Sequence, residues 1–219
     1  MTMKIAVIGG GYVGLVMAAG LAELGHAVVC AERDSEKLSL LKSGISPIHE
    51  TGLTELLVEC IQNGALTFVS EVAEAINEAE LIFIAVGTPS ATDGSADISA
   101  VKTVAGEIGK SLSTKLAAGA VPGVELTAVS AKNHDKANEF VKTLAHPVKV
   151  LRIEDLEPEA DVVVECAPAE FLGDIIAPFL KKQKKAIVLS VGAILFRPDL
   201  VELAKQSGGV IMVPTGALI

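Results

Sequence analysis

Short apolar runs alternate along this chain with longer segments in which apolar positions recur at the spacing of a helix. The runs are rich in Val, Ile and Leu and are bounded by glycine or polar residues, which is typical of buried parallel strands. Predicted strands cover residues 4–8, 27–31, 66–70, 81–86, 126–130, 148–153, 161–166, 186–191 and 210–213. Predicted helices cover residues 12–24, 35–43, 53–63, 71–78, 98–112, 135–145, 169–182 and 198–206.

This alternation predicts an α/β fold, with doubly wound parallel sheets of Rossmann-like type and helices on both faces. The chain has more strands than one six-stranded unit of this kind needs, so two half-sheets or one extended sheet stay open. Residues 111–122 are rich in small side chains. That segment is either a linker or the end of one helix that runs from Ile98 towards Gly119.

The overall composition excludes several classes of protein. The 219 residues are 50% apolar but only 3% aromatic, with no Trp, so aliphatic side chains must fill the core. The formal net charge of −9 argues against a general binder of nucleic acid or of an anionic membrane. No apolar stretch reaches membrane-spanning length without interruption, and no secretory signal is evident. We therefore expect a cytoplasmic protein with no nucleic-acid partner and no membrane partner.

The cysteines and histidines offer no metal or disulfide pattern. Cys30, Cys60 and Cys166 are far apart in the chain and odd in number, which fits neither a disulfide framework nor a zinc site. Because Cys30 and Cys166 fall inside predicted strands, we expect buried, reduced thiols. His26 follows Gly25 at a predicted helix–strand turn, so a structural role is expected for it.

The segment that follows the first predicted strand carries the strongest functional pattern. Gly9, Gly11 and Gly14 come directly after the strand and open a helix, which is the context that a dinucleotide-binding fingerprint requires. Gly9 would permit the tight turn, Gly11 would let the backbone approach a pyrophosphate, and Gly14 would let the helix pack on the strand. The helix N-terminus would offer free N–H groups and a partial positive charge to the phosphates.

An acidic residue, Glu32, ends the second predicted strand. Its carboxylate can accept hydrogen bonds from both hydroxyls of a ribose, and its charge would repel a 2′-phosphate. The expected cofactor is therefore NAD rather than NADP. The adjacent Arg33 opposes this inference, because a guanidinium there could meet a phosphate.

Five segments, the glycine loop among them, connect the first half of the chain to a known family. They are residues 8–15 (IGGGYVGL), 21–26 (LAELGH), 47–53 (PIHETGL), 82–89 (IFIAVGTP) and 93–97 (DGSAD). With them, residues 3 to about 112 resemble the N-terminal NAD-binding domain of the UDP-glucose/GDP-mannose dehydrogenases, with Glu32 in place of the usual Asp. The cofactor-binding residues expected here are Gly9, Gly11, Tyr12, Val13, Gly14, Glu32, Lys37, Gly87 and Thr88.

The resemblance then ends. The family continues with a Ser-Thr-Val-Pro segment, a central helical domain and a glycine-rich segment that carries the catalytic Cys, and this chain does not. Oxidation of a sugar alcohol to an acid needs a covalent thiol intermediate, and no cysteine here stands in the matching setting. We therefore expect an NAD-binding protein of the oxidoreductase type that is catalytically incomplete, and we assign no catalytic residue.

The second half is similar to a different family. Its segments 124–130 (VELTAVS), 161–167 (DVVVECA), 189–193 (LSVGA) and 213–217 (VPTGA) resemble those of the L-aspartate dehydrogenases. Small residues at these strand ends would let a nicotinamide lie close to the backbone, and the resemblance implies a cofactor contact at Ala167. The first strand and glycine loop of that family are missing before Lys115, and none of the four histidines stands in its catalytic setting.

Two partial dehydrogenase units thus join near residues 110–118. We expect a dinucleotide-binding domain over residues 1–112 and a second Rossmann-like segment over residues 113–219, which could be continuous with the first. A natural fusion, an engineered chimera and a truncated recombinant all fit this pattern. The alternatives to a UDP-glucose dehydrogenase-like protein are an L-aspartate dehydrogenase-like enzyme and a non-catalytic cofactor-binding scaffold. A small-molecule substrate and a homo-oligomer stay open.

Overall fold

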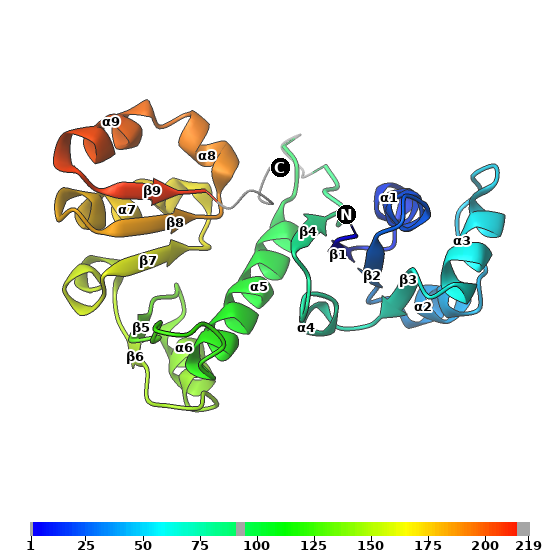
Figure 1. Cartoon of the computed structure of the whole chain (residues 1–219), viewed down its shortest axis with the longest axis horizontal. Helices are drawn as coiled ribbons and strands as arrows, with labels where there is room; N and C mark the ends of the chain where they lie inside the picture. The colour runs from blue at the N-terminus through cyan, green and yellow to red at the C-terminus, as the bar shows by residue number, and fades with distance from the viewer. Residues whose placement is uncertain (1, 91–94, 214–219) are drawn as a thin grey trace. The chain divides into compact units, whose positions relative to one another are not determined.

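In a computed structural model, which describes residues 2–90 and 95–213, the chain divides into two compact units. They comprise Met1–Ile108 and Gly109–Ile219 and are drawn together in Figure 1. Each unit contains parallel strands connected through helices, so the predicted parallel α/β fold is confirmed. The domain boundary at residue 112 stays a prediction. Over the described part of the chain, no helix combines the length and the apolar character needed to cross a membrane.

The first unit is built around a four-stranded parallel sheet in the order β3-β2-β1-β4. Ile8 of β1 is in register with Ala31 of β2 on one side and with Ile84 of β4 on the other. Because the strands are parallel, their carboxyl ends meet at one edge of the sheet, where ligands bind in folds of this type. The strands are β1 (Lys4–Ile8), β2 (Ala27–Ala31), β3 (Leu66–Val69) and β4 (Leu81–Ile84).

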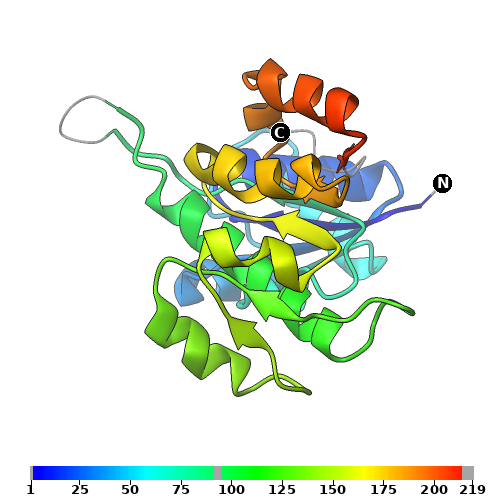
Figure 2. The same cartoon turned by 90° about the vertical axis from the view of Figure 1, so that its left-hand side faces the viewer.

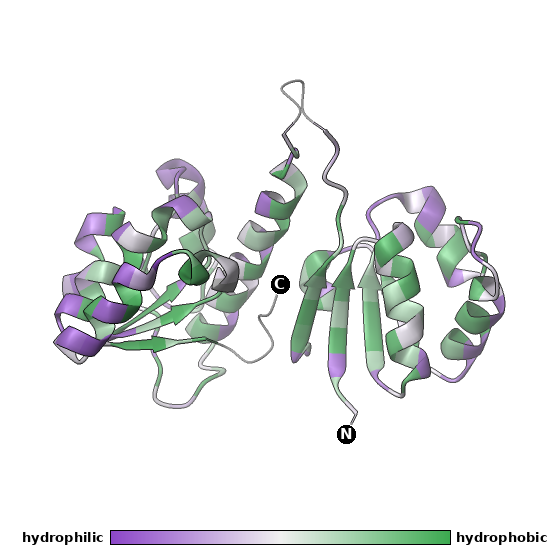
Figure 3. Cartoon of the chain, turned by 90° about the horizontal axis from the view of Figure 1, so that it is seen from above, coloured by the Kyte–Doolittle hydropathy of each residue, from purple (hydrophilic) through white to green (hydrophobic). Residues whose placement is uncertain are grey.

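Helices cover both faces of this sheet. Ile5 and Val7 of β1 are buried in a core with α1, α2 and α3, whereas Ala6 and Ile8 are buried in a second core with α4 and α5. Successive side chains of a strand point to opposite faces, so β1 separates two apolar layers; Figure 3 shows the apolar character of these strands. The helices are α1 (Tyr12–Glu23), α2 (Ser35–Lys42), α3 (Leu53–Gln62), α4 (Val72–Ala75) and α5 (Ser99–Ala117).

The second unit holds two smaller parallel sheets. One has the order β7-β8-β9, and the other consists of β5 and β6 alone. The described residues therefore form three sheets, and neither sequence alternative, two half-sheets or one extended sheet, is correct. The reason is that β5 and β6 pair only with each other over two residues each. The strands are β5 (Ala128–Val129), β6 (Lys149–Val150), β7 (Val162–Glu165), β8 (Lys185–Val188) and β9 (Val210–Met212).

Helices α7 and α9 form one core with the three-stranded sheet of the second unit. Ile176 and Phe179 of α7 and Leu200 of α9 are buried with Val163 and Ala186, which are in register on neighbouring strands. Figure 2 shows α7 in yellow and α9 in orange-red beside each other. The helices that follow α5 in this unit are α6 (His134–Val141), α7 (Leu172–Lys181), α8 (Val191–Leu195) and α9 (Pro198–Ser207), with short 3₁₀ turns at Ile153–Asp155, Glu157–Glu159 and Ala169–Phe171.

Of the two alternatives for residues 111–122, the continuous helix is correct: α5 runs without interruption to Ala117 and ends before Gly119, whose φ is +75°. Other predicted elements are shorter in the structure. The predicted strands over 126–130 and 148–153 are reduced to the two-residue strands β5 and β6, and the predicted helix over 135–145 ends at Val141. The predicted helix over 71–78 is only the single turn of α4. The predicted strand over 186–191 ends at Val188, because the amide of Ser190 donates to the Glu165 side chain instead of continuing the ladder.

Candidate functional site

Two glycines of the loop between β1 and α1 are required by the fold itself. Gly9 has a φ of +112°, and a Cβ atom there would lie 2.6 Å from the carbonyl oxygen of Ala85. A Cβ atom on Gly14 would lie 1.9 Å from the carbonyl oxygen of Gly9. Both positions therefore exclude any side chain, Gly9 through the turn and Gly14 through the close approach of α1 to the loop.

Gly11 is different, because nothing in the described protein requires a glycine there. Its φ of −80° and ψ of −169° are extended backbone that any residue adopts. A Cβ atom at Gly11 would have no described atom within 4 Å. The space above Gly11 is open, so this glycine leaves room for a ligand to approach the backbone.

The first turn of α1 faces the same open space with unshielded backbone groups. Gly11 is the N-cap, and no side chain caps the helix or places an acid in its first turn. The side chains of Tyr12 and Val13 are 59% and 67% exposed. A helix N-terminus of this kind presents N–H groups and a partial positive charge, which suits a phosphate.

Glu32 lies directly after β2, beside the glycine loop. One carboxylate oxygen accepts a hydrogen bond from the Gly10 amide at 3.1 Å, and the other accepts from the Asp34 amide at 2.9 Å. The side chain is half-buried. A carboxylate offers about four acceptor positions, so these two amides orient Glu32 and leave lone pairs for a ligand hydroxyl.

The two other charged candidates near β2 differ in their surroundings. Lys37 is exposed in the first turn of α2, and its amide donates to the Asp34 carboxylate at 3.0 Å. Its cofactor contact stays a prediction. The guanidinium of Arg33 forms an ion pair with Glu107 of α5.

Gly87 and Thr88 follow β4 and are exposed. The amide of Ala85 donates to the carbonyl of Ile8 at 2.8 Å, so the chain leaves β4 at the edge where β1 enters the glycine loop. The structure thus brings this loop, the glycine loop and Glu32 to one edge. Residues 91–94, with part of the predicted 93–97 segment, lie outside the described residues.

Ala167 belongs to the second unit, and its contact with the cofactor stays a prediction. Its amide donates to the Glu165 carboxylate at 2.7 Å. The predicted segment 213–217 has only Val213 within the described residues. The other nine predicted cofactor residues belong to the first unit.

Glu165 is a buried carboxylate that the sequence reasoning missed. It is 1% exposed, and it accepts hydrogen bonds from the Ala167 amide and from both the amide and the hydroxyl of Ser190. It therefore ties the end of β7 to the end of β8. An acid that follows three valines in an otherwise apolar strand was the feature that could have revealed it.

The pKa values of the three cysteine thiols are all raised. Burial, and secondly the Glu32 carboxylate, raise the pKa of Cys30 to about 12. Burial also raises the pKa of Cys60, and raises that of Cys166 to about 12. Cys166 lies just beyond β7 and is only partly buried, which corrects its placement inside a strand. The nucleophile in thiol catalysis is the thiolate, and raised pKa values disfavour it.

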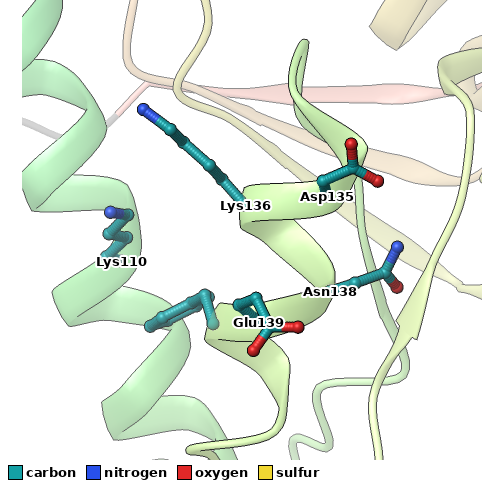
Figure 4. A pocket seen from close by; sticks show the side chains of 6 residues that line it. Lys110, Asp135, Lys136, Asn138 and Glu139 are labelled. Carbon is teal, nitrogen blue, oxygen red and sulfur yellow. The ribbon is translucent and has the colours of Figure 1, made fainter.

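The second unit has an open hollow of about 710 Å³ between α5 and α6 (Figure 4). The ammonium of Lys110 lies 5.9 Å from the centre of the Phe140 ring in its wall. Cations and acids both line the hollow, so it presents no uniform charge to a ligand. Its lining residues are Lys110, Asp135, Lys136, Asn138, Glu139 and Phe140.

Comparison with known proteins identifies both resemblances. The model of the NAD-binding domain of the UDP-glucose/GDP-mannose dehydrogenase family matches residues 3–166, which extends beyond residue 112, where the resemblance was expected to end. A UDP-glucose 6-dehydrogenase of Pseudomonas aeruginosa is 34% identical over 206 residues, which are 85% of this chain and 44% of that protein. L-aspartate dehydrogenase 3 of Bordetella bronchiseptica is 46% identical over 114 residues, which are 52% of this chain and 42% of that protein.

A solved structure supports the fold. The crystal structure of a ternary complex of GDP-mannose dehydrogenase from Pseudomonas aeruginosa aligns with a TM-score of 0.52 at 22% identity, over 98% of this chain and 47% of that one. The chain spans less than half the length of these relatives. Both families inferred from the sequence are confirmed as relatives, and the cofactor of the matched domain is NAD, as expected.

Proposed function

This chain belongs to the UDP-glucose/GDP-mannose dehydrogenase family, as its NAD-binding domain, and on that premise we propose that it binds one NAD at the carboxyl edge of the first unit's sheet. The pyrophosphate would lie over Gly11 at the N-terminus of α1. Glu32 would accept hydrogen bonds from the adenosine ribose. Gly87 and Thr88, which follow the neighbouring strand, would line the same edge.

The observation that carries this proposal is the open space at Gly11. The backbone there is extended and no described atom is within 4 Å of a Cβ atom, so the fold does not itself exclude a side chain at this position. A ligand that approaches the backbone gives a reason for a glycine. A pyrophosphate matches the uncapped amide groups of the helix that begins at the next residue.

We further propose that this chain orients the cofactor but does not turn over substrate by the thiol route of its sugar-oxidising relatives. Bound NAD supplies a hydride acceptor, and the protein supplies binding and orientation. A covalent thiol step needs a thiolate, whereas the pKa of each cysteine is raised. The substrate class proposed for the whole oxidoreductase is a nucleotide sugar; L-aspartate is the second candidate, favoured by the relative at 46% identity.

A calorimetric titration of NAD into the wild type and two glycine variants tests the site. Gly11→Val places methyl groups where the pyrophosphate would lie, and it should abolish binding. Gly20→Val is the matched control, because Gly20 lies on the same helix in similarly open space. The wild type and the control should bind with a stoichiometry near one. A stoichiometry near two, or undiminished binding by a folded Gly11→Val chain, would contradict this proposal.

The identity of the cofactor and the lack of turnover need two further measurements. Glu32→Ser should narrow the gap between NAD and NADP affinity, because the charge that opposes a 2′-phosphate is removed. If the wild type already binds NADP as tightly as NAD, Glu32 is not at the ribose. Absorbance assays with UDP-glucose, GDP-mannose and L-aspartate should show no NADH above background, and robust turnover of any of the three would overturn the proposed lack of activity.

A further inference from the structure

We propose that Glu107 of α5 is a positioning residue for cofactor choice: it holds the Arg33 guanidinium away from the place where the 2′-phosphate of NADP would lie. This inference rests on the proposed NAD site at Glu32. It concerns Arg33, whose position next to Glu32 in the sequence argued against a preference for NAD.

Consecutive side chains at the end of β2 go to opposite faces of the sheet. Cys30 is buried in the core formed with α1, α2 and α3, whereas Ala31 is buried in the core formed with α4 and α5. Glu32 continues on the first side, where its carboxylate meets the Gly10 amide. Arg33 continues on the second side, where its guanidinium meets Glu107.

The position of Glu107 on α5 explains why the pair forms. Val104, one turn earlier, is 2% exposed in the core that also holds Ala31. Residues three apart lie on the same side of a helix, so Glu107 stands near the rim of that core, next to the end of β2. It is the one acidic residue within Ser99–Ala117.

The ion pair changes what Arg33 can offer to a ligand. A free guanidinium next to Glu32 could bind a phosphate through two parallel N–H donors. Paired with Glu107, it has fewer donors available and its charge is neutralised locally. Two carboxylates would thus disfavour NADP: Glu32 by direct repulsion, and Glu107 by occupying the cation that could offset this repulsion.

The size of the effect follows from the exposure of the pair. The side chains are 56% exposed for Arg33 and 35% exposed for Glu107. Ion pairs of this kind contribute little in water, so Arg33 can exchange partners. We expect Glu107→Gln to tighten NADP binding about two- to fivefold, while the affinity for NAD changes by less than about a factor of two.

The test measures the dissociation constants of NAD and NADP for the full chain and four variants. They are Glu107→Gln, Arg33→Gln, the double variant, and Glu139→Gln as a control. Glu139 pairs with Lys142 in the second unit, at 74% exposure, so its variant removes the same charge without touching Arg33. Repeating the series in a Glu32→Gln background brings weak NADP binding into the measurable range.

The expected result is a gain in NADP affinity for Glu107→Gln that is absent from both the control and the double variant. An unchanged NADP affinity, an equal gain in the control, or a gain that persists without Arg33 would overturn the inference. These outcomes differ from failure of the proposed site. If the wild type binds neither dinucleotide, the proposed site is wrong and the role of Glu107 falls with it.

Discussion

A Cβ atom on Gly14 would lie 1.9 Å from the carbonyl oxygen of Gly9, so the start of α1 can lie this close to the glycine loop only because residue 14 has no side chain. A glycine of the dinucleotide-binding fingerprint can be required by the packing of the protein itself or by the approach of a ligand. At Gly14 the protein itself excludes a side chain. At Gly11 the surroundings are open, and the proposed dinucleotide would give a reason for the glycine.

The first prediction compares alanine at these two positions. Gly14→Ala should destabilise the chain by about 3 kcal/mol, because helix and loop must separate, even though alanine is the better helix former. Gly11→Ala should change the free energy of unfolding by less than about 0.5 kcal/mol and should weaken NAD binding. Urea unfolding followed by circular dichroism measures the first effect and calorimetry the second. A Gly14→Ala chain as stable as the wild type would contradict this interpretation.

The second prediction concerns the buried carboxylate of the second unit. Glu165→Ala leaves three donors of Ala167 and Ser190 without their acceptor, and should lower the free energy of unfolding by about 3 kcal/mol. Ser190→Ala removes one donor and should cost about 1 kcal/mol. Glu170→Ala, at an exposed acid in the next turn, is the control and should lie within about 0.5 kcal/mol of the wild type. Equal stability of the Glu165 and Glu170 variants would refute the role of the buried network.

The sequence predicts the first unit better than the second, for physical reasons. β1, α1 and β2 could be predicted because each is encoded locally, by a buried apolar run, by a glycine turn or by helical spacing. The end of β8 could not. Its apolar run continues to Val191, and the strand stops because Glu165, 25 residues earlier, binds the amide of Ser190.

The candidate site, too, could be predicted from the sequence only in part. Glycine spacing and the acid after β2 point to the loop and to Glu32, since both are near in sequence to the strands that position them. The partner of Arg33 is 74 residues away on α5, and no local pattern links the two. For this reason the sequence suggested that the Arg33 guanidinium could bind a phosphate, whereas in the fold it pairs with Glu107.

The third prediction is a pH dependence of stability that arises from Cys30. Burial, and secondly the Glu32 carboxylate, raise its pKa from 9.0 to about 12. Between these values the unfolded chain loses a proton that the folded chain keeps. The stabilising contribution of the thiol is therefore complete below pH 9 and is lost as the pH rises towards 12, at about 1.4 kcal/mol per pH unit.

Comparison with Cys30→Ala isolates this contribution. From pH 8 to pH 10.5 the wild type should lose about 2 kcal/mol more stability than the variant, because the other titrating groups are common to both. Urea unfolding at each pH measures the difference. Parallel pH profiles for the two proteins would show that the thiol is not held in its protonated form.

The last prediction concerns the backbone after α7. Gln183 has a φ of +58°, the one non-glycine residue with a positive φ among those described, and its amide donates to the Leu180 carbonyl at 3.0 Å. A side chain in this left-handed region costs about 1 kcal/mol, and glycine adopts it without that cost. Gln183→Gly should therefore raise the free energy of unfolding by about 0.5 kcal/mol, once the greater loss of chain entropy that glycine suffers on folding is subtracted.

The matched control is Lys182→Gly, where φ is −99°. It relieves no strain and should lower the free energy of unfolding by about 0.5–1 kcal/mol. Chemical unfolding of the two variants gives opposite signs if Gln183 holds this conformation in solution, and equal losses if it does not.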